Sequence, residues 1–261
     1  MDDEQQALND EGRTQWNRKA AFWDEMHGDA GNSFHRTLIS PAVESLLALQ
    51  RGERVLDVAC GSGALARRMA QLGARVIAGD FSEELIRRAK ARGGRGISYA
   101  VVDATDEHAL AALGTFDAIT CTMALMDMTV IAPLLRAAAR MLGPGGRFVF
   151  ATAHPAFNST NPRILAEMAD IDGDLHIQHA LKISAYFGIP PSQAVGAPDE
   201  PGPHNYYHRT LEELLGTAFA AGFVLDALLE PTFPPDVATP ERLRFWVNTP
   251  SIPPVLVARL R

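Results

Sequence analysis

The sequence predicts an α/β fold: a Rossmann-like, doubly wound, mostly parallel sheet of seven strands, with an N-terminal helical cap and an insertion after the fifth strand. Three observations predict it. Short apolar runs alternate with helical patterns from residue 54, the first three runs carry an aspartate at or just past their ends, and the alternation stops at His154 and resumes at about residue 211. Strands that alternate with helices in this way form parallel βαβ units, and their sheet is buried on both faces.

The elements follow in order along the chain. Residues 1–50 are expected to form helices around a polar, glycine-containing loop at 28–33. Strands are expected at 55–58, 75–78, 97–102, 116–120 and 147–151, with helices between them and a Gly-Pro-Gly-Gly break at 143–146. A helix at 211–221 and strands at 223–229 and 254–260 complete the sheet. We therefore divide the chain into a cap (1–50), a Rossmann-like domain (51–153 and 211–261) and a substrate-covering insertion (154–210).

Composition narrows the classes of partner. The 261 residues carry a net charge of −7, which disfavours nucleic acid because its backbone requires a basic surface. The two cysteines, Cys60 and Cys121, lack metal-ligand spacing and fit a reducing compartment. The acidic N-terminus is unlike a signal peptide, and the chain has no run of eighteen apolar residues. We expect a cytoplasmic monomer or homodimer that binds neither metal, membrane nor nucleic acid.

Residues 54–66 are the most informative stretch, because they predict a strand, a turn with two glycines and the start of a helix. Glycine at positions 61 and 63 lets the backbone turn sharply and approach a ligand closely. The helix start adds unpaired N–H groups and a partial positive charge. Asp57, at the strand end, is expected to point into the site. A carboxylate there repels a diphosphate and attracts a cation.

Chemically active side chains also follow the other predicted strands. Asp80 lies about 20 residues past the glycines, where an acid can accept both ribose hydroxyls, although aspartate is also common in turns. Asp103 could accept the amino group of an adenine, or could cap a helix from Thr105 onward. Thr122 and Met123 follow the fourth strand. The carboxyl ends of parallel strands share one edge, so we expect these residues to meet in one site.

These residues resemble the class I S-adenosylmethionine-dependent methyltransferases. The stretch 55–63 is similar to their glycine-rich first motif, and Asp80, Asp103 and the stretch 142–147 resemble later motifs. The resemblance is strong over about residues 50–153 and looser over 211–261. It is nearest to small-molecule enzymes of the ubiquinone-biosynthesis-like kind, including those that tailor natural products. The fourth strand ends in residues 122–127 without the Asn/Asp-Pro-Pro-Tyr motif of enzymes that methylate amino groups of nucleic acids and proteins.

The resemblance implies S-adenosylmethionine as cofactor and a small organic acceptor that receives a methyl group on oxygen, nitrogen or carbon. It places Asp57 and residues 61–63 at the methionine moiety, Asp80 at the ribose, Asp103 with Ala104 at the adenine, and Thr122 with Met123 beneath the cofactor. The full set of expected cofactor-binding residues is Asp57, Ala59, Gly61, Ser62, Gly63, Asp80, Phe81, Asp103, Ala104, Thr122, Met123 and Phe34.

Two alternatives stay open. Residues 61–66 also fit the G-x-G-x-x-A fingerprint of an NAD(P)-dependent oxidoreductase, with Asp80 as the ribose carboxylate. Asp57 counts against this alternative, since it would face a pyrophosphate. A non-catalytic module that binds S-adenosylmethionine is the other alternative, and one sequence does not exclude it.

Candidate catalytic residues come from the insertion, which holds five of the eight histidines. We predict His154 and His208 as general bases, because histidine titrates near neutral pH. A base is needed only for a hydroxyl, amide or carbon acid acceptor. His154 followed by proline could instead be a turn that redirects the chain. In the cap, Trp16, Trp23 and Phe34 could close the cleft, where aromatic faces attract a cationic sulfonium.

Overall fold

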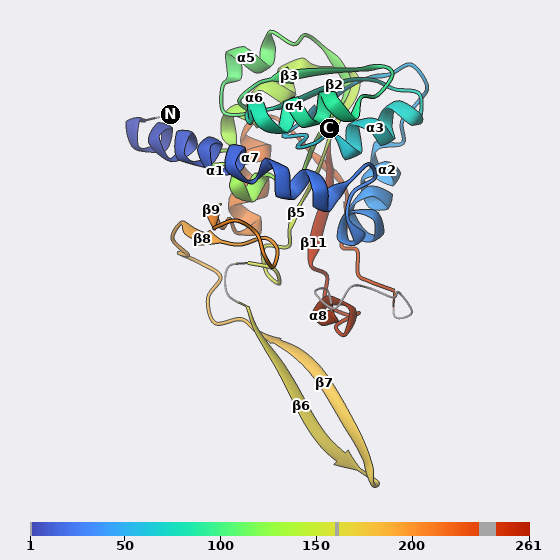
Figure 1. Ribbon diagram of the computed structural model, residues 1–261, viewed down its shortest axis with the longest axis vertical. Coiled ribbons are helices and arrows are strands. Elements are labelled where there is room, and N and C mark those ends of the chain that lie inside the picture. Colours follow the sequence, from blue (N-terminus) through green and yellow to red (C-terminus); the bar gives the residue numbers. More distant parts are fainter. Residues whose placement is uncertain (1, 160–161, 235–243) are drawn as a thin grey trace.

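The computed structural model describes residues 2–159, 162–234 and 244–261 and has a central seven-stranded sheet in the order β10-β11-β5-β4-β1-β2-β3 (Figure 1). The strands are β1 Arg54–Val58, β2 Arg75–Asp80, β3 Ile97–Val101, β4 Phe116–Thr122, β5 Leu142–Ala153, β10 Leu225–Leu229 and β11 Val255–Leu260. Neighbours from β5 to β3 pair in parallel, and β11 pairs antiparallel with both β5 and β10. The predicted Rossmann-like sheet is confirmed.

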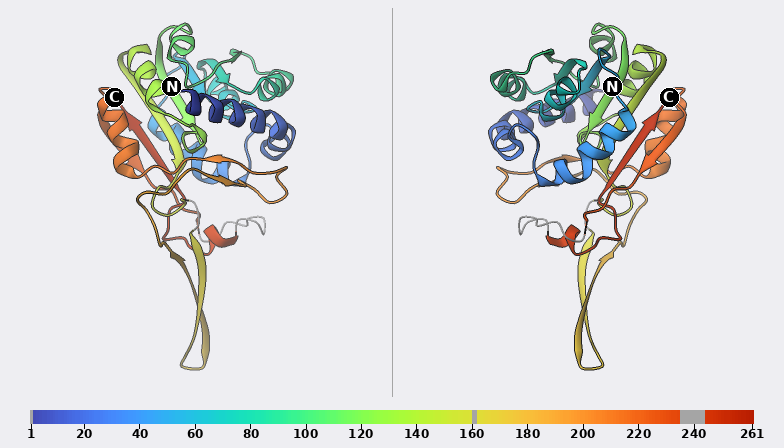
Figure 2. Two further views of the ribbon diagram at one scale, coloured as in Figure 1. Left: turned by 90° about the vertical axis from the view of Figure 1, so that its left-hand side faces the viewer. Right: turned by 90° about the vertical axis from the view of Figure 1, so that its right-hand side faces the viewer.

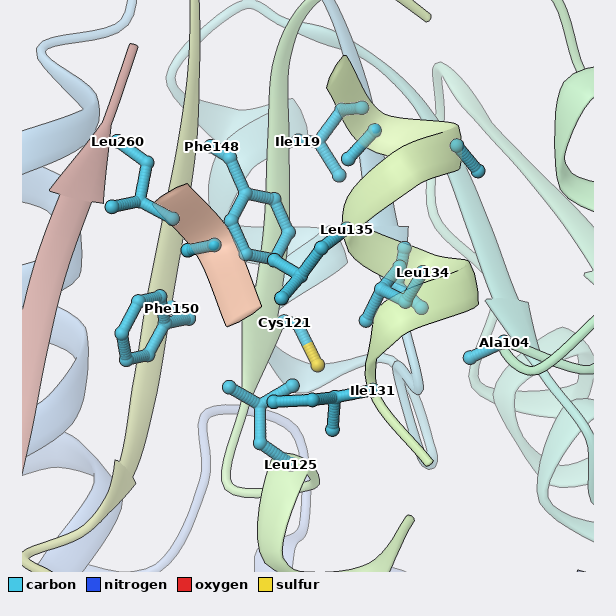
Figure 3. Close-up of a cluster of buried hydrophobic side chains, with 14 of the residues drawn as sticks. Ala104, Ile119, Cys121, Leu125, Ile131, Leu134, Leu135, Phe148, Phe150 and Leu260 are labelled. Atoms are coloured by element: carbon cyan, nitrogen blue, oxygen red, sulfur yellow. The ribbon is translucent and has the colours of Figure 1, made fainter. Parts of the chain in front are cut away.

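Helices cover both faces of this sheet. They are α1 Asp3–His27, a π-helical turn η1 His35–Ile39, α2 Ser40–Leu47, α3 Ala64–Gln71, α4 Glu83–Arg92, α5 Glu107–Ala111, a 3-10 turn η2 Leu125–Asp127, α6 Ala132–Met141, α7 Leu211–Ala220 and α8 Arg244–Val247. One core joins the sheet to α5, α6 and α7, and Figure 3 shows Leu135 of α6 beside Phe148 of β5. A second core joins the opposite face to η1, α2 and α3.

The order of the strands creates a switch point between β1 and β4. From β1 the chain builds outward through β2 to β3, and then returns to place β4 on the other side of β1. The connections at the carboxyl ends of these two strands therefore diverge. Ligands of open parallel sheets bind at such a divergence.

Helix α1 links the sheet to the insertion. Asp2 caps it in a capping box with Gln5, as its acidic start favours. Near its beginning, Asn9 donates to Asp103 just past β3 at 2.6 Å, and further along Lys19 contacts His204 of the insertion at 2.9 Å. Asp24 accepts from Arg92 of α4. The helix thus spans the distance from the end of β3 to the insertion.

The insertion holds structure that sequence periodicity did not reveal. Strands β6 Arg163–Ile171 and β7 Asp174–Lys182 pair antiparallel into a hairpin that extends away from the sheet (Figure 2). Two short strands, β8 Ser192–Ala194 and β9 His204–Tyr206, pair beside α1. The hairpin is exposed on both faces, so burial does not impose the alternation that identifies a strand.

Two further findings concern the start of β5 and the character of the helices. The helix before the Gly-Pro-Gly-Gly stretch ends at Met141, but the strand expected from residue 147 already begins at Leu142, which pairs with Phe116 across an irregular register. Among the described residues, no helix combines the length and apolarity needed to cross a membrane.

Candidate functional site

A cavity of about 1070 Å³ lies beyond the carboxyl ends of β1 to β5, at the switch point. The sheet supplies one wall and α1, η1 and the insertion supply the others. Of the residues expected to bind a cofactor, those that line it are Phe34, Ala59, Gly61, Ser62, Asp80, Phe81, Asp103, Ala104, Thr122 and Met123. The fold therefore brings together ten of the twelve residues that the sequence singled out.

The turn after β1 is held in an unusual backbone conformation at the cavity wall. Ala59 has a φ of 55°, a left-handed value that non-glycine residues rarely adopt, and Gly61 has the same φ. Met123, at the end of β4, has a φ of 53° and also lines the cavity. Strained residues of this kind cluster at ligand sites, where the surrounding structure holds them. Two such residues, Ala59 and Met123, line this cavity.

Asp80 connects the turn to the end of β2. Its Oδ2 accepts from the backbone N–H of Gly61 at 2.9 Å, and its Oδ1 accepts from the N–H of Ser82 at 2.9 Å. Burial raises the pKa of Asp80 to about 6, against these two hydrogen bonds, which lower it. A turn that binds diphosphate directs its amides at phosphate oxygens. Here the N–H of Gly61 donates to a carboxylate instead.

Asp57 and Gly63 lie elsewhere than expected. Asp57 is 1% exposed and does not line the cavity, because its Oδ1 accepts from the Thr120 hydroxyl at 2.8 Å on the neighbouring strand. Its Oδ2 has no hydrogen-bond partner, and burial raises its pKa to about 7. Gly63 caps α3 with a φ of 80°, and a Cβ there would lie 2.8 Å from Tyr99 Oη. Both residues support the turn from behind.

Asp103 faces the cavity with its carboxylate already partnered. Oδ1 accepts from the N–H and hydroxyl of Thr105, at 2.8 and 2.7 Å, and Oδ2 accepts from Asn9. The alternative of a helix cap at Asp103 is wrong, since Asp106 caps α5. Asp103 instead ties the end of β3 to α1.

The two predicted bases lie outside this cavity. His154 is 2% exposed, contacts Glu230 Oε1 through Nε2 at 2.8 Å and accepts from the N–H of Ala156 through Nδ1 at 3.1 Å. His208 donates from Nε2 to the carbonyl of Tyr186 at 2.8 Å. Neither residue lines the cavity. Their ring nitrogens instead contact Glu230, Ala156 and Tyr186, and their role as general bases stays a prediction.

A different group of ionisable residues lies where α1 meets the insertion. We call Lys19, Asp127, Glu200 and His204 the ionic cluster. Lys19 Nζ lies 2.9 Å from both Glu200 Oε1 and His204 Nδ1, with Lys19 and Glu200 side chains no more than 1% exposed. His204 Nε2 lies 3.6 Å from Asp127 Oδ1, and these two residues line the cavity.

Burial and pairing set the charges in this cluster. Burial raises the pKa of Glu200, but hydrogen bonds from His204, Lys19 and Trp23 outweigh it and hold the pKa at about 2. Burial lowers the pKa of Lys19 against the attraction of Glu200. Burial also raises the pKa of Asp127 to about 7. The cluster therefore combines a firmly ionised acid with one that titrates near neutral pH.

Sequence reasoning singled out neither Asp127 nor His204, which line the cavity. Asp127 was noted only as the end of a strand-four motif. His204 stood in the same stretch as His208, and no spacing distinguishes the two. Trp16 and Trp23, expected to close the cleft, do line it. Across the described segments, no three His, Cys, Asp or Glu residues are grouped so as to hold a metal ion.

Comparisons with known proteins identify the segment that carries β1 to β5. Residues 56–150 match the methyltransferase domain family. A ubiquinone biosynthesis O-methyltransferase of Xanthomonas oryzae pv. oryzae is 39% identical over 104 residues, 39% of this chain and 43% of that protein. The chain thus matches less than half the length of this relative.

Solved structures extend the likeness beyond that segment. An S-adenosylmethionine-dependent methyltransferase from Mesorhizobium loti is 26% identical, covers 85% of this chain and 96% of its own, and superposes with a TM-score of 0.65. The CcbJ methyltransferase of Streptomyces caelestis is 19% identical, covers 95% and 97%, and has a TM-score of 0.60. The second shows the shared fold alone. Together the matches favour a methyltransferase domain over a dinucleotide-binding one.

Proposed function

We propose that this chain, which contains a class I S-adenosylmethionine-dependent methyltransferase domain over residues 56–150, transfers a methyl group to a small organic acceptor. The observation that carries the proposal is the acidic wall of the cavity. Asp80 and Asp103 line it, and Asp57 lies buried behind the same turn with one oxygen unpartnered.

S-adenosylmethionine is the cofactor of this domain, and the residues present fit it. The ligand carries positive charge on its ammonium and sulfonium groups. The raised pKa values of Asp57 and Asp80 arise mainly from burial, and a nearby cation would stabilise both carboxylates. The backbone N–H of Gly61 already donates to Asp80, so it is not free to bind a phosphate oxygen. Asp80 would hold the ribose, Asp103 and Ala104 would lie beside the adenine, and Asp57 would act on the cationic tail through its charge, from behind the turn.

Bound S-adenosylmethionine supplies an electrophilic methyl group on sulfur. The protein's contribution is to orient the acceptor in line with that bond and to exclude water. Such alignment can supply about 7 to 11 kcal/mol in the best intramolecular cases. The cavity side of α1 presents Trp16 and Trp23, and the insertion adds Tyr206. These aromatic walls suit the apolar body of a small acceptor.

We propose oxygen as the atom that receives the methyl group. The named function of the Xanthomonas relative, O-methylation, supports this choice. The ionic cluster supports it as well, because a hydroxyl acceptor gives up a proton and a titratable group lines the cavity.

Calorimetry and product analysis test the proposal. We expect S-adenosylmethionine to bind and NAD(P)H not to bind, and we expect mass spectrometry to detect S-adenosylhomocysteine and a methylated product from a panel of phenols and alcohols. Binding without product from any acceptor would indicate the non-catalytic module. Binding of NAD(P)H in place of S-adenosylmethionine would refute the proposal.

A further inference from the structure

We propose that Asp127, oriented by His204, is the general base that removes a proton from an acceptor hydroxyl in this cavity. The inference rests on the proposed function and assigns to that site a base that neither predicted histidine supplies. Its grounds are position, an unsatisfied oxygen and a second residue that fixes the geometry.

The position of Asp127 is unusual for a carboxylate. It is the last residue of η2, close after β4, where the residues Thr122 and Met123 already line the cavity. Its side chain is 10% exposed and its Oδ1 has no hydrogen-bond partner. A buried oxygen without a partner is unfavourable, because it has lost its hydrogen bonds to water. This oxygen faces His204, and the residue that carries it borders the cavity that would hold an acceptor hydroxyl.

His204 is held in one orientation. Its Nδ1 lies 2.9 Å from Lys19 Nζ and 3.3 Å from Glu200 Oε1, and the Trp16 ring lies against the imidazole at 5.1 Å between centroids. These contacts turn Nε2 toward Asp127, 3.6 Å from its Oδ1. His204 is therefore a positioning residue that faces the carboxylate.

Glu200 keeps this arrangement in place. Its Oε1 lies 2.9 Å from Lys19 Nζ and accepts from Trp23 Nε1 at 2.9 Å, while its Oε2 accepts from the N–H of Gly196 at 2.6 Å. With Glu200 ionised, Lys19 is stabilised as a cation, and both side chains stay in contact with His204 Nδ1. The pair thus holds the imidazole with Nε2 toward Asp127.

The charges around Asp127 come from every element packed on it. His204 lies on β9, Glu200 precedes that strand, Lys19 comes from α1, and Arg209 follows β9 and donates to the carbonyls of Leu125, Met128 and Thr129 around η2. The cationic and histidine groups lower the pKa of Asp127, whereas burial and Glu200 raise it, to about 7. A base with this pKa is half ionised near neutral pH, which favours proton transfer.

The surroundings define the class of acceptor. Trp16, Tyr206, Met126 and Met128 line the cavity near Asp127, so the hydroxyl is carried by an aromatic or apolar body. The oxygen lone pair of the acceptor forms a bond to the methyl carbon, and the carbon–sulfur bond breaks with its electron pair going to sulfur. The hydroxyl proton passes to Asp127, which later releases it to water. Phenols fit this requirement.

Kinetics of Asp127→Asn test the base. With S-adenosylmethionine and catechol, we expect kcat to fall by about 10²- to 10⁴-fold, because a general base contributes that much. Cofactor affinity should stay within about twofold of wild type. The rise of kcat/KM through about pH 7 should disappear in this variant. Asp10→Asn is the matched control, since Asp10 pairs with Arg13 on the exposed side of α1.

A spectroscopic measurement tests the base without turnover. Protein saturated with S-adenosylhomocysteine is mixed with 4-nitrophenol, whose neutral and ionised forms absorb at different wavelengths. We expect the ionised form to be enriched on wild type and Asp10→Asn, and the neutral form to be bound by Asp127→Asn. Equal spectra on all three proteins, or no binding of 4-nitrophenol to wild type, would overturn the assignment to a phenol site.

His204→Phe separates positioning from folding. Loss of the imidazole, which lowers the pKa of Asp127, should move the rise of kcat/KM to higher pH, a shift that mere destabilisation does not produce. If kcat/KM of the variant rises at the same pH as that of wild type, His204 does not position Asp127. If wild-type protein binds S-adenosylmethionine but methylates no acceptor, the proposed function fails, whereas the 4-nitrophenol spectra still decide whether Asp127 accepts a proton.

Discussion

The N–H of Gly61 donates to Oδ2 of Asp80 at 2.9 Å, so that the turn after β1 and the end of β2 form one unit. This bond gives the turn an acidic face where a phosphate-binding turn has free amides. It also leaves lone pairs on the Asp80 oxygens for a ligand hydroxyl. The choice of ligand at this cavity therefore depends on a contact between residues 19 positions apart.

Asp80→Ala should weaken the binding of S-adenosylmethionine by at least about tenfold, equivalent to about 1.4 kcal/mol. The change removes the acceptor for ribose hydroxyls and frees the Gly61 amide. Isothermal titration calorimetry measures the effect. Asp174→Ala, on the exposed hairpin, serves as the control, and equal affinities for the two variants would contradict the site.

Gly63→Ala should lower the free energy of unfolding by about 1 to 3 kcal/mol, because it combines a left-handed backbone with a steric clash. The added Cβ would lie 2.8 Å from Tyr99 Oη. Gly145→Ala is the matched control, since Gly145 has a φ of 75° but open space around its Cα. Urea denaturation compares the two. A loss no larger at position 63 than at position 145 would show that Tyr99 is unimportant.

His154→Gln should lower thermal stability and leave the pH dependence of turnover unchanged. The substitution removes contacts to Glu230 and Ala156, both outside the cavity. Differential scanning fluorimetry and a kcat/KM profile from about pH 6 to pH 9 check the two halves of the prediction. If kcat/KM of the variant no longer rises with pH, His154 would again be a candidate general base.

Lys19→Met should destabilise the fold by about 3 to 5 kcal/mol, because it leaves Glu200 as a buried charge without its cation. The double variant Lys19→Met with Glu200→Gln should recover part of this loss, since neither charge is then buried alone. A double-mutant cycle by chemical denaturation gives the coupling. Additive losses would mean that the two side chains, 2.9 Å apart, do not stabilise one another.

Without cofactor, Asp57 should make the fold less stable at about pH 8 than at pH 5. Its folded pKa of about 7 exceeds the model-compound value of 3.8, so the stability it contributes is complete below 3.8 and is lost as the pH rises through 7. Each pKa unit corresponds to about 1.4 kcal/mol. His27 and His35, whose pKa values are lowered by burial, act in the opposite direction.

The variant Asp57→Asn isolates this contribution, since both histidines remain. We expect it to reduce the loss of stability between these two pH values, measured by urea denaturation. An unchanged loss would mean that Asp57 does not titrate in this range.

The sequence by itself determined the sheet and most of the residues that line the cavity at its edge. Apolar runs in alternation with helical patterns require a buried parallel sheet, and topology then brings Ala59, Asp80, Asp103 and Thr122 to one edge. Those relationships follow from local pattern and strand order, both of which can be read along the chain.

Only the tertiary structure decided which polar side chains face the cavity. Asp57 lies behind the turn rather than in the cavity, because the hydroxyl of Thr120, on a neighbouring strand, donates a hydrogen bond to its carboxylate. His204 was distinguished from His208 by Lys19, which is 185 residues away in sequence. Such pairings join segments that have no common local pattern, because a side chain's direction and partners depend on packing between distant elements. The sequence therefore predicted most of the residues that line the cavity along the sheet, and the fold revealed the ionisable residues where α1 meets the insertion.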